Sequence, residues 1–108
     1  MKKEYVVQTV NKSGKVLKEF KTDKDSLDIS KKKLTGTLKT DFNGHLNCSN
    51  NKLKRIIANN CIELNCENNE LVEIVAEKVE VLNCNGNIDL FVLENMTNLK
   101  ILNGEKIK

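Results

Sequence analysis

Apolar and polar positions recur along most of this chain at a nearly constant interval. The segments Leu46–Leu53, Leu64–Leu71 and Leu82–Asn87 share the pattern Leu-Asn-Cys-x-x-Asn, and each begins 18 residues after the one before it. Weaker copies begin at Leu27 and Leu102. A unit that repeats at a fixed interval cannot bury its apolar edge alone, so successive units stack. We therefore predict a solenoid in which each copy supplies one short strand, paired in parallel with the strand of the next coil.

Alternation within each predicted strand separates the core from the surface. Side chains two residues apart share one face of a strand, so the main Leu and the second residue after it point inward. The residues beside them then point to solvent. The predicted inward columns are Leu27, Leu46, Leu64, Leu82 and Leu102, and Ile29, Cys48, Cys66 and Cys84.

The chain before the first copy predicts a β-hairpin. Residues 4–10 are rich in β-branched side chains, Asn11–Gly14 is a cluster of turn residues, and residues 15–21 alternate. A two-stranded hairpin is marginal on its own in water, so we expect it to pack on the solenoid as a cap. With 108 residues the chain is long enough for one domain, here divided into a hairpin cap (1–23) and a solenoid of about five coils (24–108).

The repeat resembles a known family signature. Leu-x-x-Leu-x-Leu/Cys-x-x-Asn-x-Leu resembles the leucine-rich repeat, and a spacing of 18–20 residues resembles its short bacterial type. The resemblance implies a small right-handed solenoid, mainly β, whose convex side is extended and not helical. It also implies that Asn51, Asn69 and Asn87 lie inside the bend after each strand, where the amide binds backbone groups of its own and the adjacent coil. Proteins of this kind generally bind protein partners on the concave sheet.

The outward residues of that sheet are the candidate binding surface. They form a polar face with a row of Asn, which becomes acidic and partly apolar toward the C-terminus. The alternative is a scaffold role, in which stacked Asn amides only stabilise the sheet. The candidate partner-binding residues are His45, Asn47, Glu63, Asn65, Glu67, Val81, Asn83, Asn85, Ile101 and Asn103.

The cysteines are better explained by packing than by chemistry. Zinc needs thiolates that converge tetrahedrally, usually from closely spaced pairs, and this chain has no Cys-x-x-Cys pair. Cys48, Cys66 and Cys84 recur with the coil and Cys61 lies between two copies, so we expect core thiols, no metal and no cofactor. The chain has one His and no nucleophile–base pair, phosphate-binding Gly loop or carboxylate dyad, so we predict a non-enzymatic protein.

Charge is distributed unevenly and suggests a second hypothesis. The net charge is +3, but residues 1–54 carry 13 Lys+Arg against 6 Asp+Glu, and residues 55–108 carry 5 against 9. Lys24, Lys31, Lys32 and Lys33 form a basic run that nucleic acid could use. Because the run lacks interleaved aromatic residues, a solvated rim is favoured over a nucleic-acid site.

Composition also bears on location and origin. The sequence has no apolar segment of the length that a membrane span or secretory leader needs, and its four Cys suit a reducing compartment, so we expect a cytoplasmic protein without membrane contact. Abundant Lys, Asn and Ile with no Pro favour a bacterial or phage origin, and with it a small inhibitor or adaptor of such a system. Residues 99–108 predict a last strand without a cap, whose open edge could pair two copies into a homodimer.

Overall fold

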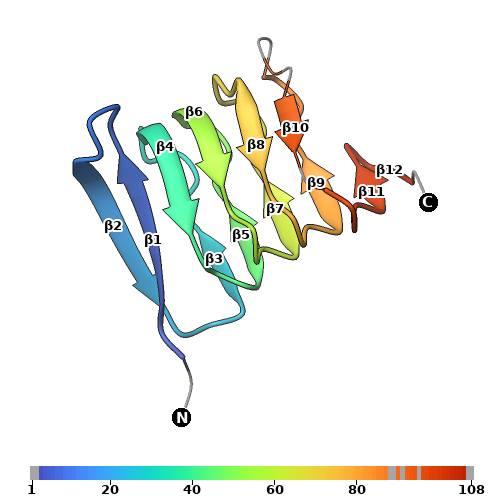
Figure 1. Ribbon diagram of the computed structural model, residues 1–108, viewed down its shortest axis with the longest axis horizontal. Coiled ribbons are helices and arrows are strands. Elements are labelled where there is room, and N and C mark those ends of the chain that lie inside the picture. The colour runs from blue at the N-terminus through green and yellow to red at the C-terminus, as the bar shows by residue number, and fades with distance from the viewer. Residues whose placement is uncertain (1–2, 88–89, 91, 95, 107–108) are drawn as a thin grey trace.

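The chain folds into two parallel layers of strands that are joined by repeated crossings. The computed structural model describes residues 3–87, 90, 92–94 and 96–106. These residues contain twelve strands in two six-stranded sheets, which we call sheet A (order β10-β8-β6-β4-β1-β2) and sheet B (order β12-β11-β9-β7-β5-β3). From β3 to β11 the chain alternates between the two sheets and builds a β-solenoid of about four turns (Figure 1). The prediction of a mainly β solenoid is confirmed.

Sheet B contains the strands of the repeated Leu-Asn copies. From β3 to β11 its strands are parallel, and their register places each main Leu beside the main Leu of the next coil, as in Leu46 beside Leu64. Its strands are β3 (Ser26–Asp28), β5 (His45–Asn47), β7 (Glu63–Asn65), β9 (Val81–Asn83), β11 (Ile101–Leu102) and β12 (Glu105–Lys106).

Sheet A forms the return side of each coil. The expected extended return side is present, and turns at residues 58–60 and 76–78 connect it to sheet B without helix. A parallel ladder joins β4, β6, β8 and β10. Its strands are β1 (Tyr5–Val10), β2 (Val16–Thr22), β4 (Thr35–Thr40), β6 (Lys52–Ile57), β8 (Glu73–Val75) and β10 (Val92–Glu94). In the part of the chain that the structure describes, no helix has the length and apolar character to cross a membrane.

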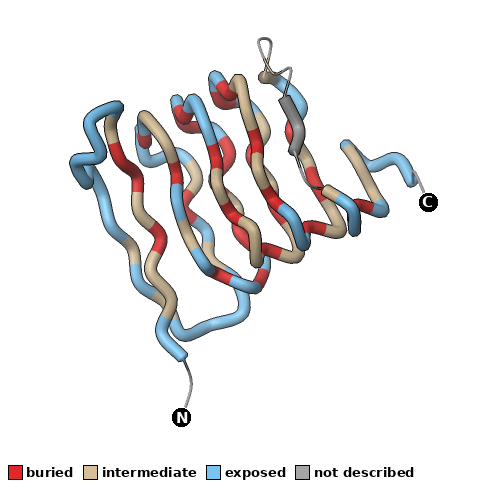
Figure 2. Tube along the Cα trace, viewed as in Figure 1, coloured by how far each residue is buried: buried red, intermediate tan, exposed pale blue. Residues whose placement is uncertain are grey.

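The core lies between the two sheets, and the predicted inward columns form the part of it that the repeated Leu-Asn copies contribute. Leu46, Leu64 and Leu82 are almost fully buried, whereas Leu27 and Leu102, in the first and last coils, are half-buried (Figure 2). The second column is buried throughout, from Ile29 through the three thiols. Complete burial of a Leu side chain contributes roughly 1.5–3 kcal/mol, so the inner coils hold most of the apolar stabilisation.

A column of Asn side chains ties successive coils together at the bend after each strand. The Nδ2 group of Asn69 donates to the carbonyls of Cys66 in its own coil (3.1 Å) and of Cys48 in the preceding coil (3.0 Å). Its Oδ1 accepts from the backbone N–H of Leu53 at 3.0 Å. Asn51 and Asn87 make the equivalent contacts one coil earlier and one coil later. The bend role predicted for these residues is confirmed.

The N-terminal hairpin continues sheet A. β1 pairs antiparallel with both β2 and β4, so the hairpin covers the edge that β4 would otherwise expose, while β3 forms the corresponding end of sheet B. The hairpin packs on the core through buried Val7 and through an edge-to-face contact between Tyr5 and Phe42, whose ring centroids lie 5.5 Å apart. The predicted hairpin is confirmed to within one residue at each end of its strands.

The C-terminal end differs from the sequence prediction. The fifth Leu-Asn copy contributes only the two-residue strand β11, which then turns back into β12. Asn103 and Gly104 adopt positive φ angles of 52° and 83°, as two-residue hairpin turns of this kind require. The count of about five coils was therefore one too high, and the prediction of an uncapped last strand was wrong. Any pairing of two copies through this end of sheet B would have to use β12.

Candidate functional site

The outer face of sheet B presents two rows of side chains in strand register. The ladder pairs place the residue before each main Leu in the first row and the residue after it in the second row. The first row is Ser26, His45, Glu63, Val81 and Ile101, and the second row is Asp28, Asn47, Asn65 and Asn83. The sequence therefore placed these candidate residues on the correct face and in the correct order.

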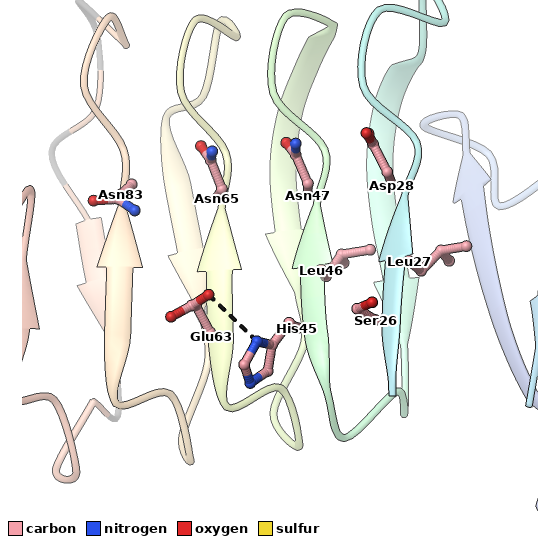
Figure 3. Close-up of a pocket in the computed structure, with 9 residues that line it drawn as sticks. All are labelled: Ser26, Leu27, Asp28, His45, Leu46, Asn47, Glu63, Asn65 and Asn83. Carbon is pink, nitrogen blue, oxygen red and sulfur yellow. Dashed lines mark ion pairs between the residues drawn. The ribbon is translucent and has the colours of Figure 1, made fainter. Parts of the chain in front are cut away.

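A pocket lies on this face over the first coils. Figure 3 shows Asn47 and Asn65 side by side at the ends of β5 and β7, with Asp28 next to them on β3. His45 and Glu63 lie toward the other end of the same strands. The lining residues are Ser26, Leu27, Asp28, His45, Leu46, Asn47, Glu63, Asn65 and Asn83.

The Asn side chains of the second row use their oxygens locally. Asn47 Oδ1 accepts from the backbone N–H and the hydroxyl of Ser49, at 3.0 and 2.7 Å. Asn65 Oδ1 accepts from the backbone N–H of Glu67 at 3.2 Å. These are Asx turns, which end a strand by binding the backbone two residues further on.

The Asx turns leave the amide nitrogens of Asn47 and Asn65 available. Within the described residues neither Nδ2 group has a hydrogen-bond partner, and no side-chain amide of the second row bonds another. Each amide therefore offers two N–H donors to solvent or to a partner. Because adjacent strands lie about 4.8 Å apart, the two donor groups are spaced at the strand repeat.

The first member of the second row carries a negative charge. Asp28 Oδ1 accepts from the backbone N–H of Ser30 at 2.9 Å, in the same geometry as the Asn members. The pKa of Asp28 lies below its ordinary value, chiefly because the Ser30 hydroxyl and then the Ser30 N–H bind the carboxylate, with nearby Lys32 and Lys31 adding to the effect. The second row thus begins with an acceptor and continues with donors.

In the first row an ionisable pair bridges two coils. His45 Nδ1 lies 3.4 Å from Glu63 Oε2, and the two side chains are 60% and 43% exposed. The sequence predicted solvent exposure for His45 but did not pair it with Glu63. The 18-residue offset was the available signal, since it places the two residues opposite each other on neighbouring strands.

The remaining candidates lie toward the C-terminus. Val81 and Ile101 are half-buried neighbours, and Glu67 and Asn85 follow the ends of β7 and β9. The prediction that Asn103 belongs to the outward face of the sheet is wrong. It lies beyond β11 in the hairpin turn, where its Oδ1 accepts from the backbone N–H of Cys84 at 2.7 Å.

Asn103 therefore holds the last turn and does not extend the second row of sheet B. The dipeptide Asn103-Gly104 was the missed signal, because Asn-Gly is the preferred sequence of a two-residue hairpin turn.

Lys31–Lys33 form the bend that follows β3, whereas Lys24 lies before β3 and is not part of that bend. Lys24, Lys31, Lys32 and Lys33 are all exposed. Lys31 and Lys33 have positive φ angles of 55° and 59°, and the backbone N–H of Lys32 donates to Asn51 Oδ1. The conformation of Lys31–Lys33 is thus set by the bend, with their side chains directed to solvent.

The four thiols are free and buried. Burial raises the pKa of every one of them, and that of Cys61 reaches about 12, so they are protonated at neutral pH. Among the described residues, no group of three or more His, Cys, Asp or Glu side chains is arranged to hold a metal ion.

Comparison of the chain with protein-family models, with curated proteins and with solved structures finds no match. The geometry of sheet B is therefore the basis on which a function is proposed.

Proposed function

We propose that this protein is a non-enzymatic protein-binding module of the leucine-rich-repeat type, a right-handed solenoid that binds its partner on the outer, concave face of sheet B. The repeat signature and the extended return strands support the class. A cytoplasmic inhibitor or adaptor in a bacterial or phage system is the role that its small size and composition favour.

The free amide donors of Asn47 and Asn65 are the observation that carries this proposal. A hydrogen-bonding group that is fixed in place by its own Asx turn, yet retains unused donors, is preorganised for an acceptor on a partner. Backbone carbonyls of a protein segment are such acceptors, and the Asp28 carboxylate can accept an N–H from the same segment. Half-buried Val81 and Ile101 add apolar surface beside the polar row.

The test exchanges only the donors. In Asn47→Asp/Asn65→Asp each Oδ1 can still accept its local bond, so the Asx turns are kept while both NH2 groups are lost. We expect the partner, captured from an extract of the source cells and then purified, to bind this variant at least about tenfold more weakly in calorimetry.

The matched control is Asn43→Asp/Asn59→Asp, which adds the same charge outside the two rows of sheet B. Asn59 also accepts a backbone N–H, that of Glu77, through Oδ1. Equal affinity of both double variants for the partner would contradict the proposal.

Nucleic acid remains the second candidate, because the side chains of Lys31, Lys32 and Lys33 are exposed together at one bend. It predicts retention on a polyanion column that falls steeply with salt and is lost when these three residues are changed to Glu. Retention unaffected by those changes would contradict it.

A further inference from the structure

A second hollow lies on the opposite side of the molecule, on the outer face of sheet A. It is formed where the β1–β2 turn meets β4 and β6, and two adjoining pockets share Lys12, Thr37 and Arg55. We call it the basic groove. Its cations are Lys12, Lys39, Lys54 and Arg55, and its apolar lining includes Val10 and Ile57.

A β-bulge places two consecutive cations in this groove. Gly36 pairs with Leu53, but Thr37 pairs with Arg55. Lys54 is therefore an extra residue that pairs with no residue of β4. In a regular strand, side chains at consecutive positions point to opposite faces. The bulge lets both Lys54 and Arg55 be exposed, while Leu53 is fully buried.

The neighbouring strand is fitted closely to the bulge. Gly36 has a φ of 78°, and a Cβ atom there would lie 2.2 Å from the carbonyl oxygen of Val10. The β1–β2 ladder also shifts register between Thr9 and Val10. These two irregularities lie side by side and bring the hairpin turn, with Lys12, next to the bulge.

Two of the groove's cations already bind carboxylates. Arg55 Nε lies 2.6 Å from Glu73 Oε1 on β8, and Lys54 Nζ pairs with Glu70 Oε1. The hydrogen bond from Lys54 lowers the pKa of Glu70. The groove thus holds carboxylates at its β8 side through contacts within the chain itself.

The other two cations have no such partner. Among the described residues, neither Lys12 nor Lys39 forms an ion pair. Both line the same pocket as Val10 and Ile57. Val10 is only 7% exposed and Ile57 is half-buried, so the hairpin side of the groove combines unneutralised positive charge with apolar surface supplied mainly by Ile57.

We propose that the basic groove binds an acidic, partly apolar segment of a protein partner. Its carboxylates pair with Lys12 and Lys39, and its apolar side chains contact half-buried Ile57 and Val72. This site is separate from the face of sheet B and lets the solenoid contact partners on both sides. Nucleic acid fits the groove less well, because its lining has no aromatic residue for base stacking and a phosphate chain offers no side chain to the apolar positions.

The experiment measures the fluorescence anisotropy of a labelled octapeptide of alternating Glu and Val titrated with the full chain. We expect saturable binding at low ionic strength that weakens at about 0.15 M salt. Lys12→Glu/Lys39→Glu should weaken binding at least about tenfold, and the neutral pair Lys12→Gln/Lys39→Gln should weaken it in the same direction. The control Lys78→Glu/Lys106→Glu makes the same charge change at exposed positions outside the groove and should change affinity less than about twofold.

Three outcomes would overturn the proposal. Equal losses in the groove and control variants would mean attraction to the overall charge of the protein. Equal affinity for a Glu-Gly octapeptide would mean that the apolar lining is not used. Tighter binding of a labelled single-stranded oligonucleotide, lost in the Lys12/Lys39 variants, would assign the groove to nucleic acid. Circular dichroism and urea midpoints of each variant show whether it is folded.

Discussion

Asn65 and Asn69 lie four residues apart on one coil and have opposite roles. Asn69 is 7% exposed, and its amide binds Cys48, Cys66 and Leu53 across two coils. Asn65 is half-buried and binds only the backbone of its own turn, which leaves its NH2 group free. The same side chain thus joins coils when it points into the bend and is available to a partner when it points out of the sheet.

The difference follows from where backbone groups would otherwise be left unpaired. Inside the bend, carbonyls and N–H groups of two coils have no strand partner, and leaving each buried and unpaired costs about 1–3 kcal/mol. On the outer face water can satisfy the same groups, so an amide there contributes little to stability. We therefore expect the column of Asn51, Asn69 and Asn87 at the bends to govern stability. We expect the second row of sheet B, which includes Asn47 and Asn65, to govern partner binding.

The largest effect is expected for Asn69→Ala. The substitution leaves the buried N–H of Leu53 unpaired. It also removes one of the two Asn amide bonds that each of the Cys48 and Cys66 carbonyls accepts. We therefore expect a loss of about 3–5 kcal/mol in the free energy of unfolding, measured with urea and circular dichroism. A loss below about 1 kcal/mol would show that water or a shifted backbone replaces the hydrogen bonds of the Asn69 amide.

The buried thiols should make the stability of the fold fall at alkaline pH. Because burial raises the pKa of Cys48, Cys61 and Cys66 above that of an exposed thiol, the unfolded chain loses protons first as pH rises, and stability falls with it. The effect is absent below about pH 8 and reaches about 1.4 kcal/mol for each fully buried thiol near pH 10.

Urea unfolding between pH 7 and 10 measures this decline. The control is a variant with all four Cys changed to Ala, whose stability should depend less steeply on pH over this range. The same slope in both proteins would assign the decline to other groups.

The smallest effect on stability is expected for Asn65→Ala. It removes one hydrogen bond at a half-exposed position, so we expect a loss of about 0.5–1 kcal/mol in the free energy of unfolding, well below that of Asn69→Ala. If Asn65→Ala and Asn69→Ala lower the free energy of unfolding equally, the division between the Asn column at the bends and the second row of sheet B would be wrong.

Much of the fold could be predicted because its determinants are periodic. Leu46, Leu64 and Leu82 are buried as the 18-residue interval requires, and the register of sheet B follows from the same interval. The repeat signature also located Asn69 in the bend. In a regular repeat the sequence of one coil predicts its contacts with the next coil, since each coil packs mainly on its neighbours.

The features that escaped prediction arise where the period is broken. Lys54 and Arg55 share one face only because β4 and β6 pair with a bulge, and Asn103 leaves the second row of sheet B because the last coil turns back. Consecutive cations inside a strand were a hint of the bulge, but the pairing partner that creates it is 17 or more residues earlier in the chain. No local pattern records that pairing.

The sequence alone determined which side chains form columns, because the repeated interval places equivalent residues of successive coils next to each other. Only the tertiary structure decided what happens outside that interval: β1 adds to the edge of β4, His45 meets Glu63, and four cations gather at one groove. These contacts depend on the relative positions of whole strands, which the packing of the two sheets sets and no single segment encodes.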